Sequence, residues 1–230
     1  MRPMRSPFLL TTLLLAACAS TPQPLEEPVD VLILGDSISI GYTNNVRTAL
    51  EGRATVVRPT NADGKRAQNC AGTNNGVEKL DQWLAIGDFD VIHFNFGLHD
   101  LKRVDPETGR NSANPNHPHQ ADPERYEAQL RDITTRIKAT GARVIFATTT
   151  PVPEKVGGPL RLPEDAINYN AIALRVMEEL DVPIDDLHAF AQPRLAELQN
   201  PRDVHFSPAG SQALGEEVAR AILAVAGLGE

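Results

Sequence analysis

One serine, one histidine and one aspartate in this chain have the types and spacing needed for nucleophilic catalysis. Ser37 lies in a Gly-Asp-Ser turn after an aliphatic run, and a serine hydroxyl becomes a useful nucleophile only when a neighbouring base accepts its proton. His205 is the candidate base, because it precedes a predicted final helix and can reach back over the edge of a sheet. Asp203 would point to the same side as His205 in an extended segment, and its carboxylate could then orient the imidazole.

A reaction through an acyl-serine also needs hydrogen-bond donors for the negatively charged oxygen of its tetrahedral intermediate. The backbone N–H groups of Ser37 and Gly72 are candidates, since glycine lets a substrate approach the main chain closely. His99 follows another predicted strand and could add a side-chain donor. These residues predict an oxyanion hole beside Ser37.

The elements that must position these residues alternate between strands and helices along the chain. Strands are predicted at 29–34, 54–57, 90–96, 144–147 and 182–184 from aliphatic and β-branched runs. Helices are predicted at 43–50, 77–84, 123–140, 163–180 and 208–225 from apolar stripes and cap residues. Such alternation favours a parallel sheet that is covered on both faces. We therefore predict one three-layer, flavodoxin-like α/β domain over residues 29–228, with a small, mostly parallel five-stranded sheet.

A long polar loop, residues 101–121, leaves the same sheet edge as Ser37, and such a loop is more often a functional lid than idle chain. His117 and His119 have a spacing that could suit a metal, but no nearby group completes a recognisable ligand set. We expect a lid or a substrate contact there, and neither a metal nor a cofactor. Cys70 has no identifiable activating base and is interpreted as a small packed residue.

Four ordered stretches of the sequence resemble the motif blocks of the SGNH or GDSL hydrolase superfamily. They are residues 35–39, 69–72, 97–100 and 203–207, and the resemblance spans residues 31–226. Gly-Asp-Ser alone is a weak motif, whereas four ordered blocks in an α/β pattern are specific. The resemblance implies a serine esterase without a cofactor, in which Ser37 is the nucleophile, His205 the base and Gly72 an oxyanion-hole donor.

Two positions depart from the family pattern. His99 stands where the family usually has asparagine. We favour an oxyanion role for it over a substrate contact or a loop-holding role, and such a donor would titrate near physiological pH. The family's usual acid stands three residues before the histidine, where this chain has Arg202. Two arrangements remain open: Asp203 orients His205, or a backbone carbonyl does so in a dyad-like site.

Residues 1–17 resemble a bacterial lipoprotein signal peptide. A short basic region precedes a ten-residue apolar run that is too short to span a bilayer as a mature helix. The run ends in Leu-Ala-Ala-Cys, which resembles a lipobox, and a plain secretory signal is the alternative. We expect Cys18 to carry lipid, residues 18–28 to form a polar, proline-rich tether, and the protein to be membrane-anchored in the bacterial cell envelope, outside the cytoplasm.

The net charge of −8 argues against nucleic acid or an anionic membrane surface as a binding partner. We expect hydrolysis of carboxylic esters through an acyl-serine, with short acyl esters or acetylated glycans favoured by the expected location and the polar, Asn-rich loop. The alternatives are an O-acyltransferase that uses the same serine, a lysophospholipase-like or lipase-like acylhydrolase, and a non-enzymatic binding lipoprotein. The sequence indicates no oligomeric state.

Overall fold

Five parallel strands form the central sheet of this computed structural model, which describes residues 28–228. The strands are β1 (Val29–Leu34), β2 (Ala54–Val57), β3 (Val91–Phe94), β4 (Arg143–Ala147) and β5 (Ile184–Asp185), in the spatial order β2-β1-β3-β4-β5. All four pairings are parallel, and Val31 lies opposite both Val56 and Val91. The order reverses between β1 and β3, and ligands of open α/β sheets bind at the carboxyl ends of the strands at such a switch point.

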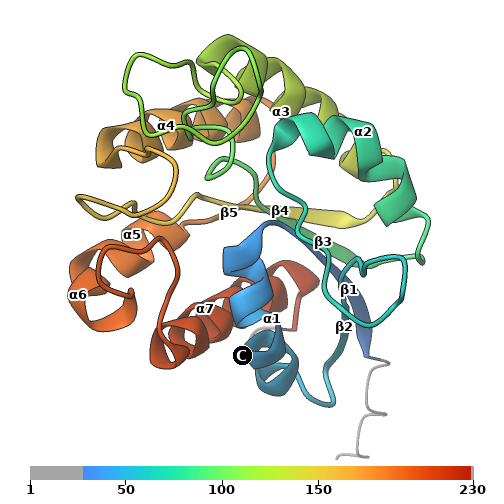
Figure 1. Ribbon diagram of the computed structural model, residues 1–230. Coiled ribbons are helices and arrows are strands. Elements are labelled where there is room, and N and C mark those ends of the chain that lie inside the picture. The colour runs from blue at the N-terminus through green and yellow to red at the C-terminus, as the bar shows by residue number, and fades with distance from the viewer. Residues whose placement is uncertain (1–27, 229–230) are drawn as a thin grey trace, which may run out of the picture.

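Helices cover both faces of this sheet and complete three layers (Figure 1). One face carries α2 (Thr73–Leu84), α3 (Pro123–Lys138) and α4 (Pro163–Glu179). The other carries α1 (Ser37–Ala49), α5 (Leu187–Ala191), α6 (Leu195–Leu198) and α7 (Pro208–Ala226), with a 3₁₀ turn, η1 (Gln192–Arg194), between α5 and α6. The predicted α/β class and parallel five-stranded sheet are confirmed.

Two helices begin at the cap residues that the sequence predicts. Asp122 accepts a hydrogen bond from the backbone nitrogen of Arg125 at 2.9 Å and starts α3, while Ser207 accepts one from Gly210 at 3.0 Å and starts α7. Each cap is followed by proline, which fits the first helical position because its missing N–H has no intrahelical acceptor there.

The predicted starts of two other helices are wrong. Helix α1 begins at Ser37 and not near Thr43, because Oδ1 of Asp36 accepts from the backbone nitrogen of Ile38 at 2.8 Å and caps it. Helix α2 begins at Thr73 and not near Val77, because its first turn is capped by a carboxylate from a distant loop. The short helices α5 and α6 have too few residues for a recognisable apolar period and were not predicted.

Helices α1 and α7 pack directly against each other on one face of the sheet. Gly215 of α7 makes this approach possible, since a Cβ there would lie 2.5 Å from Cβ of Asn45 and 3.1 Å from the carbonyl oxygen of Tyr42. Val46 of α1 and Val218 of α7 are fully buried in the same layer. The position of α7 relative to α1 is therefore fixed by close backbone contact.

A buried polar pair crosses the sheet beneath this layer. Nε2 of His93 on β3 lies 2.9 Å from Oδ2 of Asp185 on β5, and both side chains are fully buried. The His93 ring also meets the ring of Tyr42 edge-on, with centroids 6.4 Å apart. The His93 side chain is thus packed in the core, and the Asp185 carboxylate depends on it for a partner.

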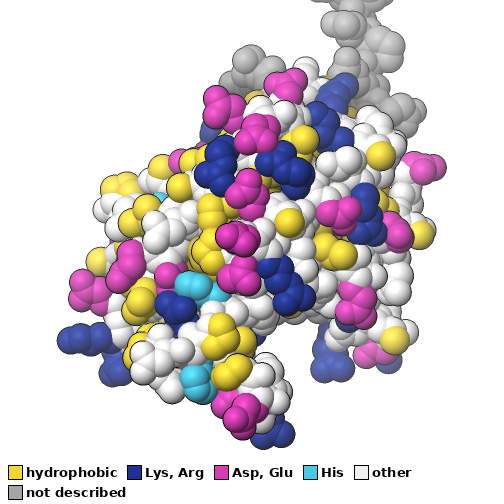
Figure 2. Space-filling model, turned by 90° about the horizontal axis from the view of Figure 1, so that it is seen from above, with side chains coloured by type: hydrophobic (Ala, Val, Ile, Leu, Met, Phe, Trp, Pro, Cys, Tyr) yellow, Lys and Arg dark blue, Asp and Glu magenta, His cyan; other side chains and the backbone are white. Residues whose placement is uncertain are grey.

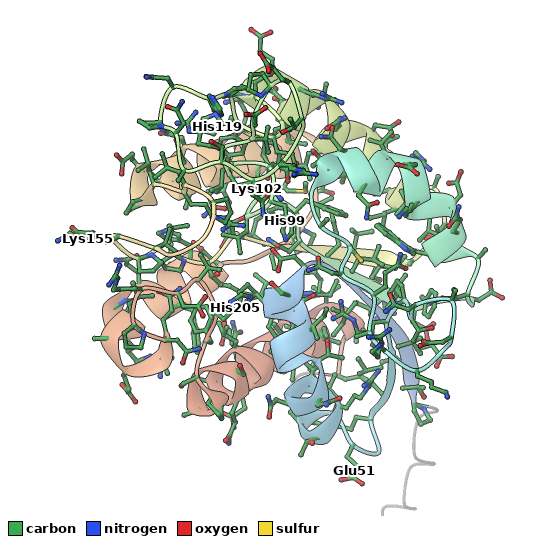
Figure 3. All side chains as sticks on the ribbon, viewed as in Figure 1. Glu51, His99, Lys102, His119, Lys155 and His205 are labelled. Carbon is green, nitrogen blue, oxygen red and sulfur yellow. The ribbon has the colours of Figure 1, made fainter. Side chains whose placement is uncertain are left out.

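Part of the predicted lid, residues 101–121, is tied down by backbone hydrogen bonds to Leu160. The backbone nitrogen of Arg103 donates to Leu160 at 2.9 Å, and Leu160 donates to Ser112 at 2.8 Å. His119 lies 3.3 Å from Asp165 of α4, away from the carboxyl end of β1 (Figure 3). Among residues 28–228, no group of three or more histidine, cysteine or acidic side chains is placed to hold a metal.

Acidic and basic side chains alternate over the outer face of α2, α3 and α4 (Figure 2). Ion pairs bridge these helices: Arg136–Asp81 at 2.6 Å, Arg131–Glu179 at 2.7 Å and Arg175–Glu127 at 2.6 Å. Pairs that are open to solvent contribute about 0–1 kcal/mol each, so packing of the core supplies most of the stability.

The predicted signal peptide (1–17), Cys18 and nearly all of the tether lie outside the described residues. Within residues 28–228, no helix combines the length and the apolar character needed to cross a membrane.

Candidate active site

Ser37, His205 and Asp203 form a continuous hydrogen-bonded chain. Oγ of Ser37 lies 2.9 Å from Nε2 of His205, and Nδ1 of the same ring lies 2.7 Å from Oδ1 of Asp203. Both distances are within the range of good hydrogen bonds. Of the two arrangements left open by the sequence, the structure therefore places the carboxylate, and not a backbone carbonyl, against Nδ1. This geometry lets the imidazole accept a proton from Ser37 while the carboxylate orients the ring.

Asp203 reaches the ring through a turn and not through an extended segment, so the reason expected from the sequence is wrong. Arg202 has a left-handed φ of 59°, and Oδ1 of Asp203 also accepts from the backbone nitrogen of His205 at 3.1 Å. An aspartate that bonds to the backbone two residues ahead is a common turn geometry. Partial burial acts to raise the pKa of Asp203, but the hydrogen bonds from His205 outweigh it and lower the pKa, which keeps the carboxylate ionised.

The Gly-Asp-Ser turn is held from beneath by a buried arginine that sequence reasoning missed. The Arg58 guanidinium donates to Oγ of Ser39 at 3.1 Å and to the carbonyl oxygen of Gly35 at 3.2 Å. Ser39 in turn donates to the carbonyl oxygen of Asp36 at 2.7 Å. Ser37 is thus the first residue of α1, and the backbone on both sides of it is fixed. No local pattern around Arg58 indicates this role, because its partners lie up to 23 residues away.

The backbone N–H groups of Ser37 and Gly72 are available as oxyanion donors. Neither donates to any other residue in the part of the chain that the structure describes. The two segments meet where the backbone nitrogen of Cys70 donates to Gly35 at 3.1 Å. Ser37 starts α1 and Gly72 caps α2, so both amides also lie at the positive end of a helix dipole.

Gly72 is held in place by Asp100. A Cβ at Gly72 would lie 2.7 Å from Oδ1 of Asp100 and 2.8 Å from Nε2 of Gln120, so only glycine fits. The same Oδ1 accepts from both the backbone nitrogen and the hydroxyl of Thr73, at 2.7 and 2.6 Å, and caps α2. Burial raises the pKa of Asp100 to about 6. Sequence reasoning placed Asp100 in a motif block but gave it no role.

His99 lies across the site from His205, beside Lys102 (Figure 3). Burial, together with the nearby charges of Lys102 and Arg161, lowers the pKa of His99 to about 3. The expectation that this side chain titrates near physiological pH is therefore wrong. At neutral pH the ring is uncharged and carries one N–H, which makes no hydrogen bond to any residue in 28–228.

Cys70 is fully buried, and burial raises the pKa of its thiol to about 11. A thiol with such a pKa remains protonated at neutral pH and is a poor nucleophile. This agrees with its interpretation as a packed residue, and it leaves Ser37 as the nucleophile candidate.

A sequence profile described as the GDSL-like lipase/acylhydrolase family matches residues 33–213, a stretch that contains all the site residues above. No curated protein matches the chain significantly.

Several solved structures share the fold. An acetyl xylan esterase, AlAXEase, has a TM-score of 0.65 at 15% identity over 84% of this chain and 100% of its own. The lipase/acylhydrolase from Enterococcus faecalis has a TM-score of 0.65 at 19% identity, covering 84% and 95%. The acetylxylan esterase Axe2 from Geobacillus stearothermophilus has 0.62 at 17%, covering 86% and 94%. At these identities the likeness shows the fold alone.

Proposed function

Because the chain belongs to the GDSL-like lipase/acylhydrolase family, we propose that it hydrolyses carboxylic esters with Ser37 as the nucleophile. The observation that carries the proposal is the hydrogen-bonded chain from Asp203 through His205 to Ser37. Beside it lie the backbone amides of Ser37 and Gly72 at helix N-termini, which donate to no residue in 28–228, and this is the arrangement that acyl transfer requires.

In the first half of the proposed reaction, Oγ of Ser37 attacks the ester carbonyl carbon while His205 accepts the serine proton. The charged Asp203 stabilises the resulting imidazolium. The N–H groups of Ser37 and Gly72, with the neutral ring of His99, donate to the oxyanion. When the intermediate collapses, the bond to the alcohol oxygen breaks, His205 returns the proton to that oxygen, and an acyl-serine remains.

In the second half, water replaces the alcohol. His205 accepts a proton from the water as its oxygen attacks the acyl carbonyl, and the same donors stabilise the second oxyanion. Collapse breaks the bond to Oγ, which regains the proton from His205, and the carboxylic acid leaves. His99 has a pKa far below that of a free imidazole, so its ring stays neutral and takes up no second proton during the reaction.

We favour short acyl esters and acetylated glycans as substrates. The support is that two of the structural relatives are named as acetyl xylan esterases. The choice is tested with 4-nitrophenyl acetate, butyrate and octanoate and with acetylated xylan. Free acetic acid as the product supports hydrolysis, whereas transfer of acetyl to an added xylo-oligosaccharide would identify an acyltransferase.

Replacing Ser37 by alanine tests the nucleophile directly. We expect Ser37→Ala to fold normally and to lose at least about 10³-fold in kcat, because the remaining donors cannot form the acyl-enzyme. Ser211→Ala is the matched control: it removes a hydroxyl from α7 that makes no side-chain hydrogen bond to a described residue, and it should stay within about twofold of the wild type. A Ser37→Ala protein that keeps most of the activity would remove Ser37 from the mechanism.

A further inference from the structure

Arg161 carries a guanidinium that the proposed mechanism leaves unused. The residue is 9% exposed, and its Nε donates to the carbonyl oxygen of Leu98 at 2.9 Å, which fixes the guanidinium against the backbone immediately before His99. Its two terminal nitrogens make no hydrogen bond or ion pair with any residue in 28–228, yet they are not among the polar atoms that are sealed from solvent. They are therefore reachable from solvent, and the charge of Arg161 acts on His99, Asp36 and Asp203 of the site.

A charged group that is nine-tenths buried is costly unless it is paired. Burial accordingly lowers the pKa of Arg161. The planar guanidinium presents parallel N–H donors that match the two oxygens of a carboxylate, and it is the side chain best suited to such recognition. The free donors of Arg161 thus have the chemistry of an anion-binding group.

A second cation lies close by. Lys102 is half-buried next to His99 (Figure 3), and burial together with the charge of Arg161 lowers its pKa. Within the described part of the chain, neither cation makes an ion pair with a carboxylate. Two neighbouring cations repel each other, and an anion bound between them would relieve both charges.

The acidic side chains around these cations already have other partners. Asp203 accepts from His205, Asp36 accepts from the backbone of Ile38, and Asp100 accepts from Thr73. Each of the three interacts electrostatically with Arg161 or Lys102 but forms an ion pair with neither. The terminal donors of Arg161 are therefore left for a group that comes from outside the protein.

We propose that Arg161, together with Lys102, binds a carboxylate of the ester substrate, so that the site favours anionic esters over neutral ones. The inference rests on the proposed function and narrows its substrate class. The carboxylate can belong to the acyl part, as in a half-ester of a dicarboxylic acid, or to the alcohol part, as in an acetylated uronic acid.

Two matched pairs of esters separate these sources. For the acyl side, mono-4-nitrophenyl glutarate is compared with its methyl ester by release of nitrophenol. For the alcohol side, 4-acetoxybenzoate is compared with methyl 4-acetoxybenzoate by release of acetate. The readout is the ratio of kcat/KM for the anionic and neutral members, and comparing this ratio between protein variants cancels their different intrinsic reactivities.

In Arg161→Gln we expect this ratio to fall by about tenfold or more for at least one pair, the size expected when a hydrogen bond to a charged group is lost. Lys102→Gln should lower the ratio for the same pair and keeps the test decisive if Arg161→Gln does not fold. Arg110→Gln removes an equal charge from an exposed position in the 101–121 loop and should leave the ratio unchanged. Ratios within twofold of the wild type in both site variants, for both pairs, would overturn the proposal.

Failure of the proposed function gives a different result. If the folded wild-type protein cleaves no ester, binding of glutarate and of 4-hydroxybenzoate is measured by calorimetry. Binding that is lost in Arg161→Gln supports the anion site without hydrolysis, whereas no binding to the wild type overturns the anion site as well.

Discussion

Replacing His99 by asparagine gives a pH-dependent test of the oxyanion hole. The pKa of His99 is about 3 in the folded protein, against an ordinary value of 6.5. Because the unfolded chain takes up this proton first, the wild type loses free energy of unfolding as the pH falls from about 6.5 towards 3. Asparagine does not titrate, so the free energy of unfolding of His99→Asn does not include this pH-dependent loss.

The size of the effect follows from the two pKa values. Each pH unit in this range costs about 1.4 kcal/mol, so at pH 5 the wild type should lose about 2 kcal/mol that the variant keeps. For a domain of this length, 2 kcal/mol corresponds to about 4–8 °C in Tm. The Tm of the variant minus that of the wild type should therefore be larger by this amount at pH 5 than near pH 8. The pKa of Asp100, raised to about 6, acts in the opposite direction in both proteins and largely cancels in the comparison.

Activity provides the second readout for the same variant. The asparagine amide can still donate to the oxyanion, so we expect kcat to be kept or raised. His99→Ala should instead lose about 10²–10³-fold, the usual cost of one oxyanion donor. Since His99 is already neutral over the working range, His99→Asn should leave the acid limb of the kcat/KM profile in place.

The measurements are thermal unfolding from pH 8 to 4.5 and hydrolysis of 4-nitrophenyl acetate from pH 5 to 9. A stability difference between the wild type and His99→Asn that does not change with pH would refute a buried neutral His99. A large loss of activity in His99→Asn, with correct folding, would show that His99 contacts substrate and is not an interchangeable donor.

Two further substitutions test the acid of the site and the buried pair beneath it. Asp203→Asn should lower kcat by about 10²–10⁴-fold at unchanged Tm, because the amide no longer selects the ring tautomer that accepts the serine proton. A loss of less than tenfold would mean that Asp203 does not orient His205. His93→Leu leaves the Asp185 carboxylate buried without its partner, so it should cost about 3–5 kcal/mol of unfolding free energy and lower Tm by about 6–20 °C. A Tm within 2 °C of the wild type would contradict the importance of this pair.

The sequence predicts most of the fold because most of its determinants are local. Aliphatic runs mark the strands, and the pairs Asp122-Pro123 and Ser207-Pro208 mark helix starts without knowledge of any distant residue. The start of α1 was misplaced because Asp36 both ends the turn after β1 and caps the helix. The sequence-based prediction treated the Gly-Asp-Ser turn as a loop that is separate from the helix at 43–50.

Determinants formed by distant residues could not be predicted. The start of α2 depends on Asp100, which lies 27 residues from Thr73, and Arg161 is held by an oxygen 63 residues away. Ser37, Gly72, His99, Asp203 and His205 were named from their residue types and their places in four ordered stretches, although His99 and Asp203 depart from the family pattern. The neutral state of His99 was missed, since it arises from burial and from neighbouring charges that only the folded chain brings together.

The contact between α1 and α7 links the assembly of the candidate site to a segment that is synthesised late. Ser37 and His205 are 168 residues apart in the sequence. The segment that carries His205 leads directly into α7, which packs closely on α1 at Gly215. During synthesis the proposed nucleophile, Ser37, emerges early, whereas its proposed base, His205, emerges only shortly before α7. If Ser37 and His205 act as proposed, we expect a nascent chain to cleave no ester until α7 docks on α1.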